Sequence, residues 1–562
     1  MKKKKIAMLM SAVMILSGTA MPSEMAYAMD NIQMSAEETD ENDSAEEAES
    51  EDQETNVEED ADDFGDDSSD EEVSVESQNE ENDEDEVSAF SDGENVATGE
   101  DEKGEPVESG SCGENATYKL YADGTVYIEG TGSVVARTGY NLHYNEDIKS
   151  IVIEEGITAL KCDTVDYVAD YDTGVFEGND NLVNVKLPES LKSIDVGTFL
   201  GCDNLVDINL PEGLISIGSS AFAHCGLKTV VLPENVTDIG GGVFRNCSNL
   251  RSVKLPLNID KISWRMFEEC KRLSNIEIPS SVKEIGDSAF YSCNALTEIT
   301  LPEGLISIGE GAFAGTGITE ITLPEGLQNI GNGAFAYSLF SSIEIPENIT
   351  KIGNSVFKNC DKLESIIIPQ NVTKIGKSAF EDCDKLESIT IPENVTDLGN
   401  RALASCDNLK TVVIKATIME LKEEMFYFDS NLENVTLPEN LTKIGKNAFL
   451  NCGRLEKIDL PDSVSEIDEY AFHSSSIKRI KFPQNFTFIG YGAFYGCEEL
   501  TSISFPEKLE TVDIDAFKGN IGYGNINDIF PEFINDSLKE GIDYFDNKIK
   551  GFNDKKVIIA AP

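Results

Sequence analysis

A phenylalanine recurs every 22 or 23 residues through most of the 562-residue chain, and no other feature of the sequence constrains the fold as strongly. This column has sixteen positions, and only Leu403 departs from phenylalanine. Its other members are Phe176, Phe199, Phe222, Phe244, Phe267, Phe290, Phe313, Phe335, Phe357, Phe380, Phe426, Phe449, Phe472, Phe494 and Phe517. A proline column keeps the same spacing and is interrupted only at Lys415. A fixed period of about 20 to 50 residues indicates a stack of repeats rather than one conventional core.

The repeat unit reads L-x-x-I-x-I/L-P-E-x-V-T-x-I-G-x-x-A-F-x-x-C-x-x, and each part predicts a local structure. Alternating apolar residues in 363–368 predict a short strand, which Pro369 ends because proline has no N–H to donate. Residues 372–376 predict a second extended piece with a sharp turn at its glycine. Ser378–Phe380 is expected to be a short helical turn. The unit therefore predicts a β-rich solenoid, a right-handed superhelix of about 16 repeats with short parallel strands and short helical turns, over residues 151–530.

The region before the repeats is expected to contain a signal peptide and a disordered tether. Residues 1–28 show four lysines, an apolar run and a cleavage site expected after Ala28, so export is expected, with no transmembrane segment after cleavage. Residues 29–109 are of low complexity, and from Asp30 to Ser109 they hold 36 acidic residues against one basic residue. Such a segment repels itself and has little apolar surface to bury, which predicts disorder.

Two further regions flank the repeats. Residues 110–150 are expected to form a β-hairpin cap, because Asp123-Gly124 separates two stretches of alternating polarity. Residues 531–562 are assigned to a C-terminal cap or tail. Each end of a repeat stack needs such a cover, because the terminal repeats have no neighbour against which to bury their apolar faces.

The unit L-P-E-x-V-T-x-I-G-x-x-A-F-x-x-C resembles the repeat of the BspA-like leucine-rich-repeat family of bacterial surface proteins. The segment from Ser111 to Gly130 also resembles the cap that often precedes those repeats, so the resemblance covers about residues 110–520. It implies a leucine-rich-repeat fold, a location outside the cell, secreted or at the cell surface, and a role in adhesion to host extracellular proteins or to other cells.

The twelve cysteines favour free thiols over a disulfide framework. Ten of them stand three residues after a position of the phenylalanine column, one per repeat; nine follow a phenylalanine and Cys406 follows Leu403. Stacked side chains that point the same way are poorly placed to bridge. These ladder cysteines are Cys202, Cys225, Cys247, Cys270, Cys293, Cys360, Cys383, Cys406, Cys452 and Cys497. Cys112 and Cys162 lie off the ladder, and a bridge between them stays open.

Catalytic and metal chemistry find little support in the sequence. Three scattered histidines and the absence of C-x-x-C or H-E-x-x-H motifs predict no metal site, no cofactor and no catalytic triad, hence no enzyme. The net charge of −60 argues against nucleic acid, which requires clustered lysine and arginine. The expected partner is an extracellular protein or a cell-surface ligand.

The predicted binding surface is the outward side of the first strand of each repeat. Two columns of outward residues, one residue per repeat in each, run along it. We call them the Lys186 column and the Asp207 column, each after one of its members. Candidate residues on or beside these columns are the basic Lys254, Lys457, Lys478, Arg479 and Lys481 and the acidic Glu277, Glu298, Glu320 and Glu344. Extended solenoid faces of this kind bind ligands. Carbohydrate recognition in an extracellular degradative system is an alternative, although these columns lack the aromatic residues that sugar platforms use.

Overall fold

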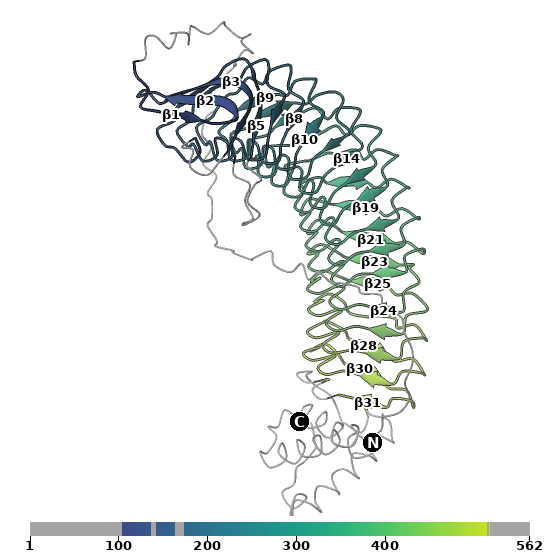
Figure 1. The fold of residues 1–562 in the computed structure, drawn as a ribbon. Coiled ribbons are helices and arrows are strands. Elements are labelled where there is room, and N and C mark those ends of the chain that lie inside the picture. Colours follow the sequence, from purple (N-terminus) through teal and green to yellow (C-terminus); the bar gives the residue numbers. More distant parts are fainter. Residues whose placement is uncertain (1–103, 137–141, 163–173, 514–515, 518–562) are drawn as a thin grey trace, which may run out of the picture. The chain divides into compact units, whose positions relative to one another are not determined.

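The structure is a computed structural model that describes residues 104–136, 142–162, 174–513 and 516–517. The expected signal peptide, most of the acidic segment and the C-terminal region 531–562 lie outside these residues. Within the described residues the chain is a stack of coils made of strands and turns (Figure 1). Each coil has two strand sides and one turn side, so the predicted β-rich leucine-rich-repeat solenoid is confirmed.

The first strand side is formed by the L-x-x-I-x-I segments, which pair in parallel from coil to coil. The register is one repeat, as in Ser252 paired with Asn275. The strands are β4(Ser150–Ile153), β6(Asn184–Lys186), β9(Thr229–Val231), β11(Ser252–Lys254), β13(Asn275–Ile276), β17(Ser342–Glu344), β19(Ser365–Ile367), β21(Ser388–Ile391), β23(Thr411–Ile414), β25(Asn434–Thr436), β28(Arg479–Lys481) and β30(Ser502–Ser504). Alternate side chains point inward and outward, so each strand presents a regular pattern to solvent.

The second strand side follows the proline and pairs in the same way. Its strands are β5(Ile157–Lys161), β7(Ser193–Ile194), β8(Ser216–Ile217), β10(Asp238–Ile239), β12(Lys261–Ile262), β14(Glu284–Ile285), β15(Ser307–Ile308), β16(Asn329–Ile330), β18(Lys351–Ile352), β20(Lys374–Ile375), β22(Asp397–Leu398), β24(Glu420–Leu421), β26(Lys443–Ile444), β27(Glu466–Ile467), β29(Phe488–Ile489) and β31(Thr511–Val512). The predicted second extended piece is therefore present, although it is only two residues long in most coils.

The turn side differs from the expected helical turn. Ser378 and Asp382 take φ values of 55° and 57°, and each regular coil has two such left-handed residues four positions apart. A right-handed helix cannot continue through them, and no helix occurs among the described residues. The amides of Ser378, Phe380 and Asp382 instead donate to carbonyls of the next coil at 2.9, 2.9 and 3.0 Å. The turn side is thus a third ladder of backbone hydrogen bonds between coils.

A small antiparallel sheet closes the N-terminal end of the stack. It consists of β1(Glu108–Ser111), β2(Asn115–Leu120) and β3(Thr125–Val135), with a turn at Gly124, whose φ is +84°. The long strand β3 then pairs in parallel with β4 through its first half and with β5 through its second half. One strand therefore joins this sheet to both strand sides of the stack.

The core is a continuous row of phenylalanine rings inside the coils. Adjacent rings stack nearly parallel, as in Phe290 and Phe313, whose centroids lie 5.4 Å apart at an interplanar angle of 2°. The column members are at most 3% exposed. Leu403 occupies the one gap in the row and is also fully buried. Each ring needs the coils on both sides to be covered, which couples neighbouring repeats.

Candidate functional site

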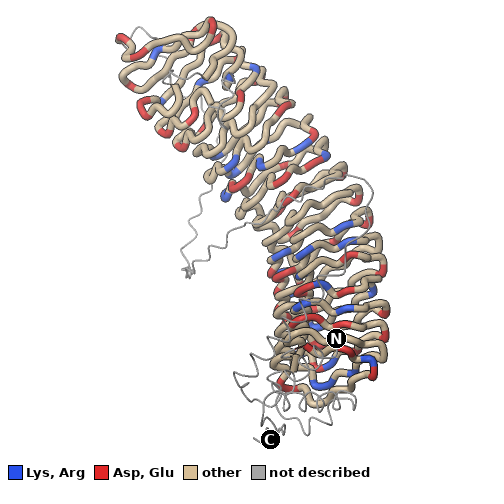
Figure 2. The backbone as a smooth tube through the Cα atoms, turned by 60° about the horizontal axis from the view of Figure 1, so that its bottom comes forward, with Lys and Arg blue, Asp and Glu red and all other residues tan. Residues whose placement is uncertain are grey.

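The nine candidate residues lie on the first strand side, and the structure arranges them in zones along it. We call the outward side of these strands, with the Lys186 and Asp207 columns, the strand face. Glu277, Glu298, Glu320 and Glu344 occupy four consecutive coils, all exposed. None of the four forms an ion pair with another described residue, whereas Lys254, one coil earlier, pairs with Glu234 at 3.6 Å. Figure 2 marks the acidic and basic residues along the coils.

Four of the five basic candidates, all except Lys254, lie on two adjacent coils near the C-terminal end of the stack. Lys457 and Arg479 are neighbours through an isolated parallel bridge, and Lys481 ends β28. These three are exposed and make no ion pair with any residue of the described ranges. Lys478 differs, because its ammonium lies 2.6 Å from Glu456 and 3.4 Å from Glu499. The unneutralised positive charge is therefore smaller than the four candidates predict.

Between these zones the strand face is uncharged over four coils. It presents Ile367, Thr390, Val413 and Thr436 in the Lys186 column, flanked by serine, threonine and asparagine in the Asp207 column. Ile367 is 82% exposed, the most exposed large apolar side chain among the described residues. An isolated exposed apolar residue is common, but this one lies at the centre of a polarised surface.

A pocket opens in the acidic zone where the strand ladder is interrupted. Coils 318–323 and 340–345 are not joined by a strand pair, since β17 pairs only with β19 and Glu320 bridges only back to Glu298. The pocket encloses about 430 Å³, and its walls include Glu320, Glu344, Glu325 and Glu347. Glu325 and Glu347 are absent from the candidates because the sequence places them outside the strand. The site is open and acidic, so it favours a cationic group over an anion.

The ten ladder cysteines lie in the interior of the stack, next to the row of phenylalanine rings, and all are buried with free thiols. Each thiol donates to the backbone carbonyl of the column phenylalanine one coil earlier, as Cys270 does to Phe244 at 3.1 Å and Cys406 to Phe380 at 3.1 Å. The predicted free thiols are thus confirmed for the ladder, and the hydrogen bond adds a reason for cysteine that the sequence did not reveal. Cys112 is also a buried free thiol, so the bridge left open for it is not formed.

These thiols are expected to be unreactive towards alkylating reagents in the folded protein. Burial raises the pKa of Cys247 to about 12 and that of Cys270 well above its usual value, so little thiolate forms near pH 8. Treatment of the native chain with iodoacetamide, followed by peptide mass spectrometry, should leave the ladder cysteines unmodified. The same treatment in denaturant should modify all of them. Rapid native modification of ladder cysteines would contradict this burial.

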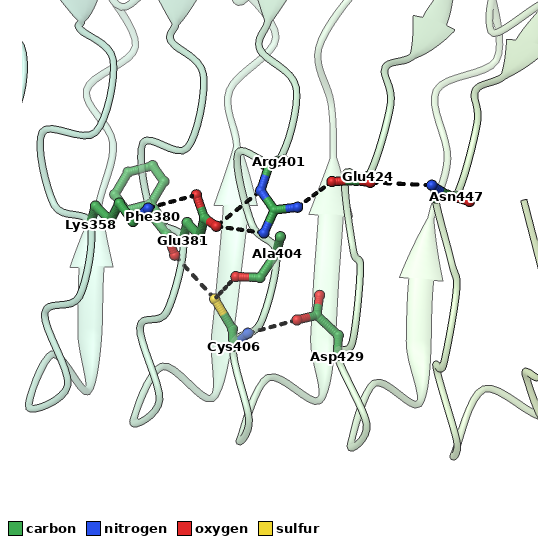
Figure 3. Close-up of polar contacts among 9 residues, drawn as sticks. All are labelled: Lys358, Phe380, Glu381, Arg401, Ala404, Cys406, Glu424, Asp429 and Asn447. Atoms are coloured by element: carbon green, nitrogen blue, oxygen red, sulfur yellow. Dashed lines mark hydrogen bonds and ion pairs between the residues drawn. The ribbon is translucent and has the colours of Figure 1, made fainter. Parts of the chain in front are cut away.

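One cluster of charged residues lies partly inside the stack, around the irregular coil that contains Leu403 and Lys415. The Arg401 guanidinium donates to Glu381 at 2.9 and 2.6 Å and also bonds Glu424, whose other oxygen accepts from Asn447 at 3.2 Å (Figure 3). The side chain of Glu381 is only 5% exposed. Burial alone would raise its pKa, but hydrogen bonds from Arg401 and Ser378 hold that pKa below the ordinary value. This network links four successive coils and is structural.

The profile described as BspA type leucine rich repeat region matches residues 171–297, 283–410 and 396–523, more than half of the chain. The chain belongs to this family. The BspA type repeats thus account for the two strand sides and the turn side, as the resemblance in the sequence implied.

Several solved structures are similar to this BspA type chain. A leucine-rich repeat protein from Bacteroides ovatus shares 26% identity, with a TM-score of 0.39, over 73% of this chain and 91% of that one. A leucine rich cell surface protein from Faecalibacterium prausnitzii shares 21%, with a TM-score of 0.38, over 74% and 99%. The pneumococcal vaccine antigen PcpA shares 19%, with a TM-score of 0.38, over 65% and 94%. No curated protein sequence matches the chain.

No group of three or more His, Cys, Asp or Glu residues is placed to hold a metal ion within the described ranges. In the same residues there is no helix long and apolar enough to cross a membrane.

Asp429 is the one acidic residue in the cysteine column of these BspA type repeats, and replacing it with cysteine should stabilise the fold. It accepts from the Cys406 amide at 2.7 Å, but its other oxygen has no partner (Figure 3). Burial raises the pKa of Asp429 well above its usual value. Its ionisation therefore costs stability as the pH rises above the unfolded-state pKa, about 4.

Denaturant unfolding of Asp429→Cys should show a gain of about 1 to 3 kcal/mol at neutral pH. The gain should shrink as the pH falls below about 4, where the wild-type carboxyl is protonated in both states. Ser338→Cys, at the same column position in a coil without a buried acid, is the matched control and should show no such pH dependence. A variant no more stable than wild type at any pH would contradict the assignment.

Proposed function

We propose that this chain is an extracellular or cell-surface interaction protein that binds its partner through the strand face. Membership of the BspA type family supports a repeat protein for protein interaction, and the lysine-rich, apolar N-terminus supports export. The observation that supports the strand face most strongly is its zoning. Unneutralised glutamates, an uncharged stretch with Ile367 82% exposed and unneutralised cations follow one another on one continuous surface.

Adhesion is the form of this function that the repeats suit best. The strand face is long, regular and open, and about 4.8 Å separates successive coils, so many weak contacts can act together over a large partner. Its two columns contain no aromatic side chain, so a stacked sugar ring finds no platform there. A protein surface is therefore the favoured partner over a carbohydrate.

The test is binding of the fluorescently labelled full chain to intact bacterial cells and to cultured epithelial cells. Saturable binding is expected to at least one of these surfaces. Thr300→Arg with Thr322→Arg adds bulk and charge to the strand face and should weaken that binding at least tenfold, about 1.4 kcal/mol. Thr237→Arg with Asn329→Arg adds the same charge on the second strand side and should leave the binding unaltered.

Three results would count against the proposal. Equal loss from both double variants would remove the strand face from the binding surface. Binding by a peptide of residues 29–109, with none by a chain lacking them, would move the function to the acidic segment. Strong, selective binding to a glycan array would favour the carbohydrate alternative.

A further inference from the structure

The zones of the strand face are ordered so that the face is complementary to itself. We propose that two copies of this chain associate through their strand faces in an antiparallel, two-fold symmetric arrangement centred on the coil of Thr390. This inference rests on the proposed function, since it names a second copy as one partner of the same surface. In a two-fold interface each contact occurs twice, so one face must supply both members of every pair.

The registration of the charged residues supports this arrangement. Three coils on the C-terminal side of Thr390 lies Lys457, and three coils on the N-terminal side lies Glu320. Four coils away in the two directions lie Arg479 and Glu298. With about 4.8 Å per coil, both pairs are equidistant from the centre, at about 14 and 19 Å. All four residues belong to the Asp207 column. A two-fold axis parallel to the strands places the Asp207 column of one copy over the Asp207 column of the other.

The apolar residues fit the same registration. Ile367 lies one coil before Thr390 and Val413 one coil after it, both in the Lys186 column. The arrangement therefore brings the highly exposed Ile367 of one copy onto Val413 of the other, twice. Burial of these side chains supplies an attraction that does not depend on charge.

The charged pairs need no existing ion pair to break, although the exposed Asp459 would lie over Thr322, beside Glu320. Lys457, Arg479, Glu298 and Glu320 form no ion pair with other residues of the described ranges, so no existing bond must break. The Lys457 ammonium would face the acidic pocket between Glu320 and Glu344. Glu387 lies near the axis and would meet its own copy, but Lys410 already neutralises it at 3.0 Å.

Neighbouring registrations are worse. A shift of the centre by half a coil towards the N-terminus still gives two charge pairs, Lys457 over Glu298 and Lys481 over Glu277, but it lays Val413 over Glu344 and loses the contact of Ile367 with Val413. The opposite shift lays Lys457 over Ser342 and removes one charge pair. The face is narrow, so about eleven coils would bury roughly 500 Å² on each copy. Because this is at the low end for specific interfaces, the dimer should be weak and reversible.

The test uses charge reversal, measured by sedimentation velocity of the full chain near physiological salt. Wild type should show a reversible monomer–dimer equilibrium. Lys457→Glu with Arg479→Glu, or Glu298→Lys with Glu320→Lys, places like charges opposite each other and should raise the dissociation constant at least about 100-fold. An equimolar mixture of the two double variants should dimerise again, because every pair is then opposite in sign.

Two controls separate the arrangement from general charge effects. Lys261→Glu with Lys351→Glu changes the net charge equally on the second strand side and should leave the equilibrium unaltered. Ile367→Asp should abolish dimerisation when introduced into the wild-type chain. Introduced into both charge-reversal double variants, it should also abolish dimerisation of their equimolar mixture.

Certain outcomes would overturn the inference. They are a wild-type chain that stays monomeric at the highest concentration reached, a mixture that stays monomeric, or a control variant that dissociates like the others. A monomeric wild type whose cell binding is still lost in Thr300→Arg with Thr322→Arg would refute the second copy alone and leave the proposed function standing.

Discussion

Replacing Phe313 with alanine is expected to lower the free energy of unfolding by about 3 to 5 kcal/mol. Phe313 is fully buried and stacks on Phe290 at 5.4 Å and on Phe335 at 5.8 Å. Removing the ring leaves a cavity that the coil backbones, tied together on three sides by hydrogen bonds, cannot collapse to fill. Urea denaturation followed by circular dichroism measures the loss.

Because a solenoid transmits its stability only through neighbouring coils, this change should also divide the unfolding transition. The coils on the two sides of Phe313 should then melt separately, as two steps in the denaturation curve. Phe428→Ala provides the control, since that side chain is 44% exposed and does not belong to the row. Equal effects of the two substitutions would show that the row of rings is not the core.

Replacing Arg401 with alanine is expected to cost about 3 kcal/mol at neutral pH, because it leaves the carboxylate of Glu381 buried without its main partner. The pKa of Glu381 is depressed in the folded state, so its contribution is present above the unfolded-state pKa, about 4, and is lost as the pH falls through the folded-state pKa. The deficit of the variant should therefore be large at pH 7 and should diminish in acid.

Unfolding in urea at several pH values measures this dependence. Arg454→Ala is the matched control, because Arg454 is 61% exposed and lies 3.8 Å from Glu433. Its loss should be within about 1 kcal/mol and should vary little with pH. If the two arginine variants behaved alike, the network around Arg401 would have no structural role.

Much of the fold could be predicted because the repeat makes one unit determine all the others. The alternation around Ile366 predicts the strand, and the Phe column predicts the buried row. The prediction of a helical turn on the turn side was wrong, because the sequence does not show which groups the backbone amides bond to. Ser378 and Asp382 accept left-handed angles, and their amides bond to the next coil, which no pattern within one repeat reveals.

The candidate site was predictable as columns but not as a charge distribution. Spacing places Lys457 and Arg479 on the strand face, whereas the neutralisation of Lys478 by Glu456 depends on side-chain geometry in the neighbouring coil. The acidic pocket arises from a missing strand pair between two coils, and strand pairing is not encoded in any single repeat. The zones and the exposure of Ile367 became visible only when the coils were stacked.

Hydroxyl-radical footprinting of the full chain, free and bound to cells, tests most directly whether the strand face is the interaction surface. Ile367 reports on that face with 82% exposure, while Trp264 and Met419, 52% and 63% exposed, report on other sides of the coils. Binding is predicted to reduce oxidation of Ile367 and to leave Trp264 and Met419 unchanged. Protection of Trp264 or Met419 with full oxidation of Ile367 would contradict the assignment of function to the strand face.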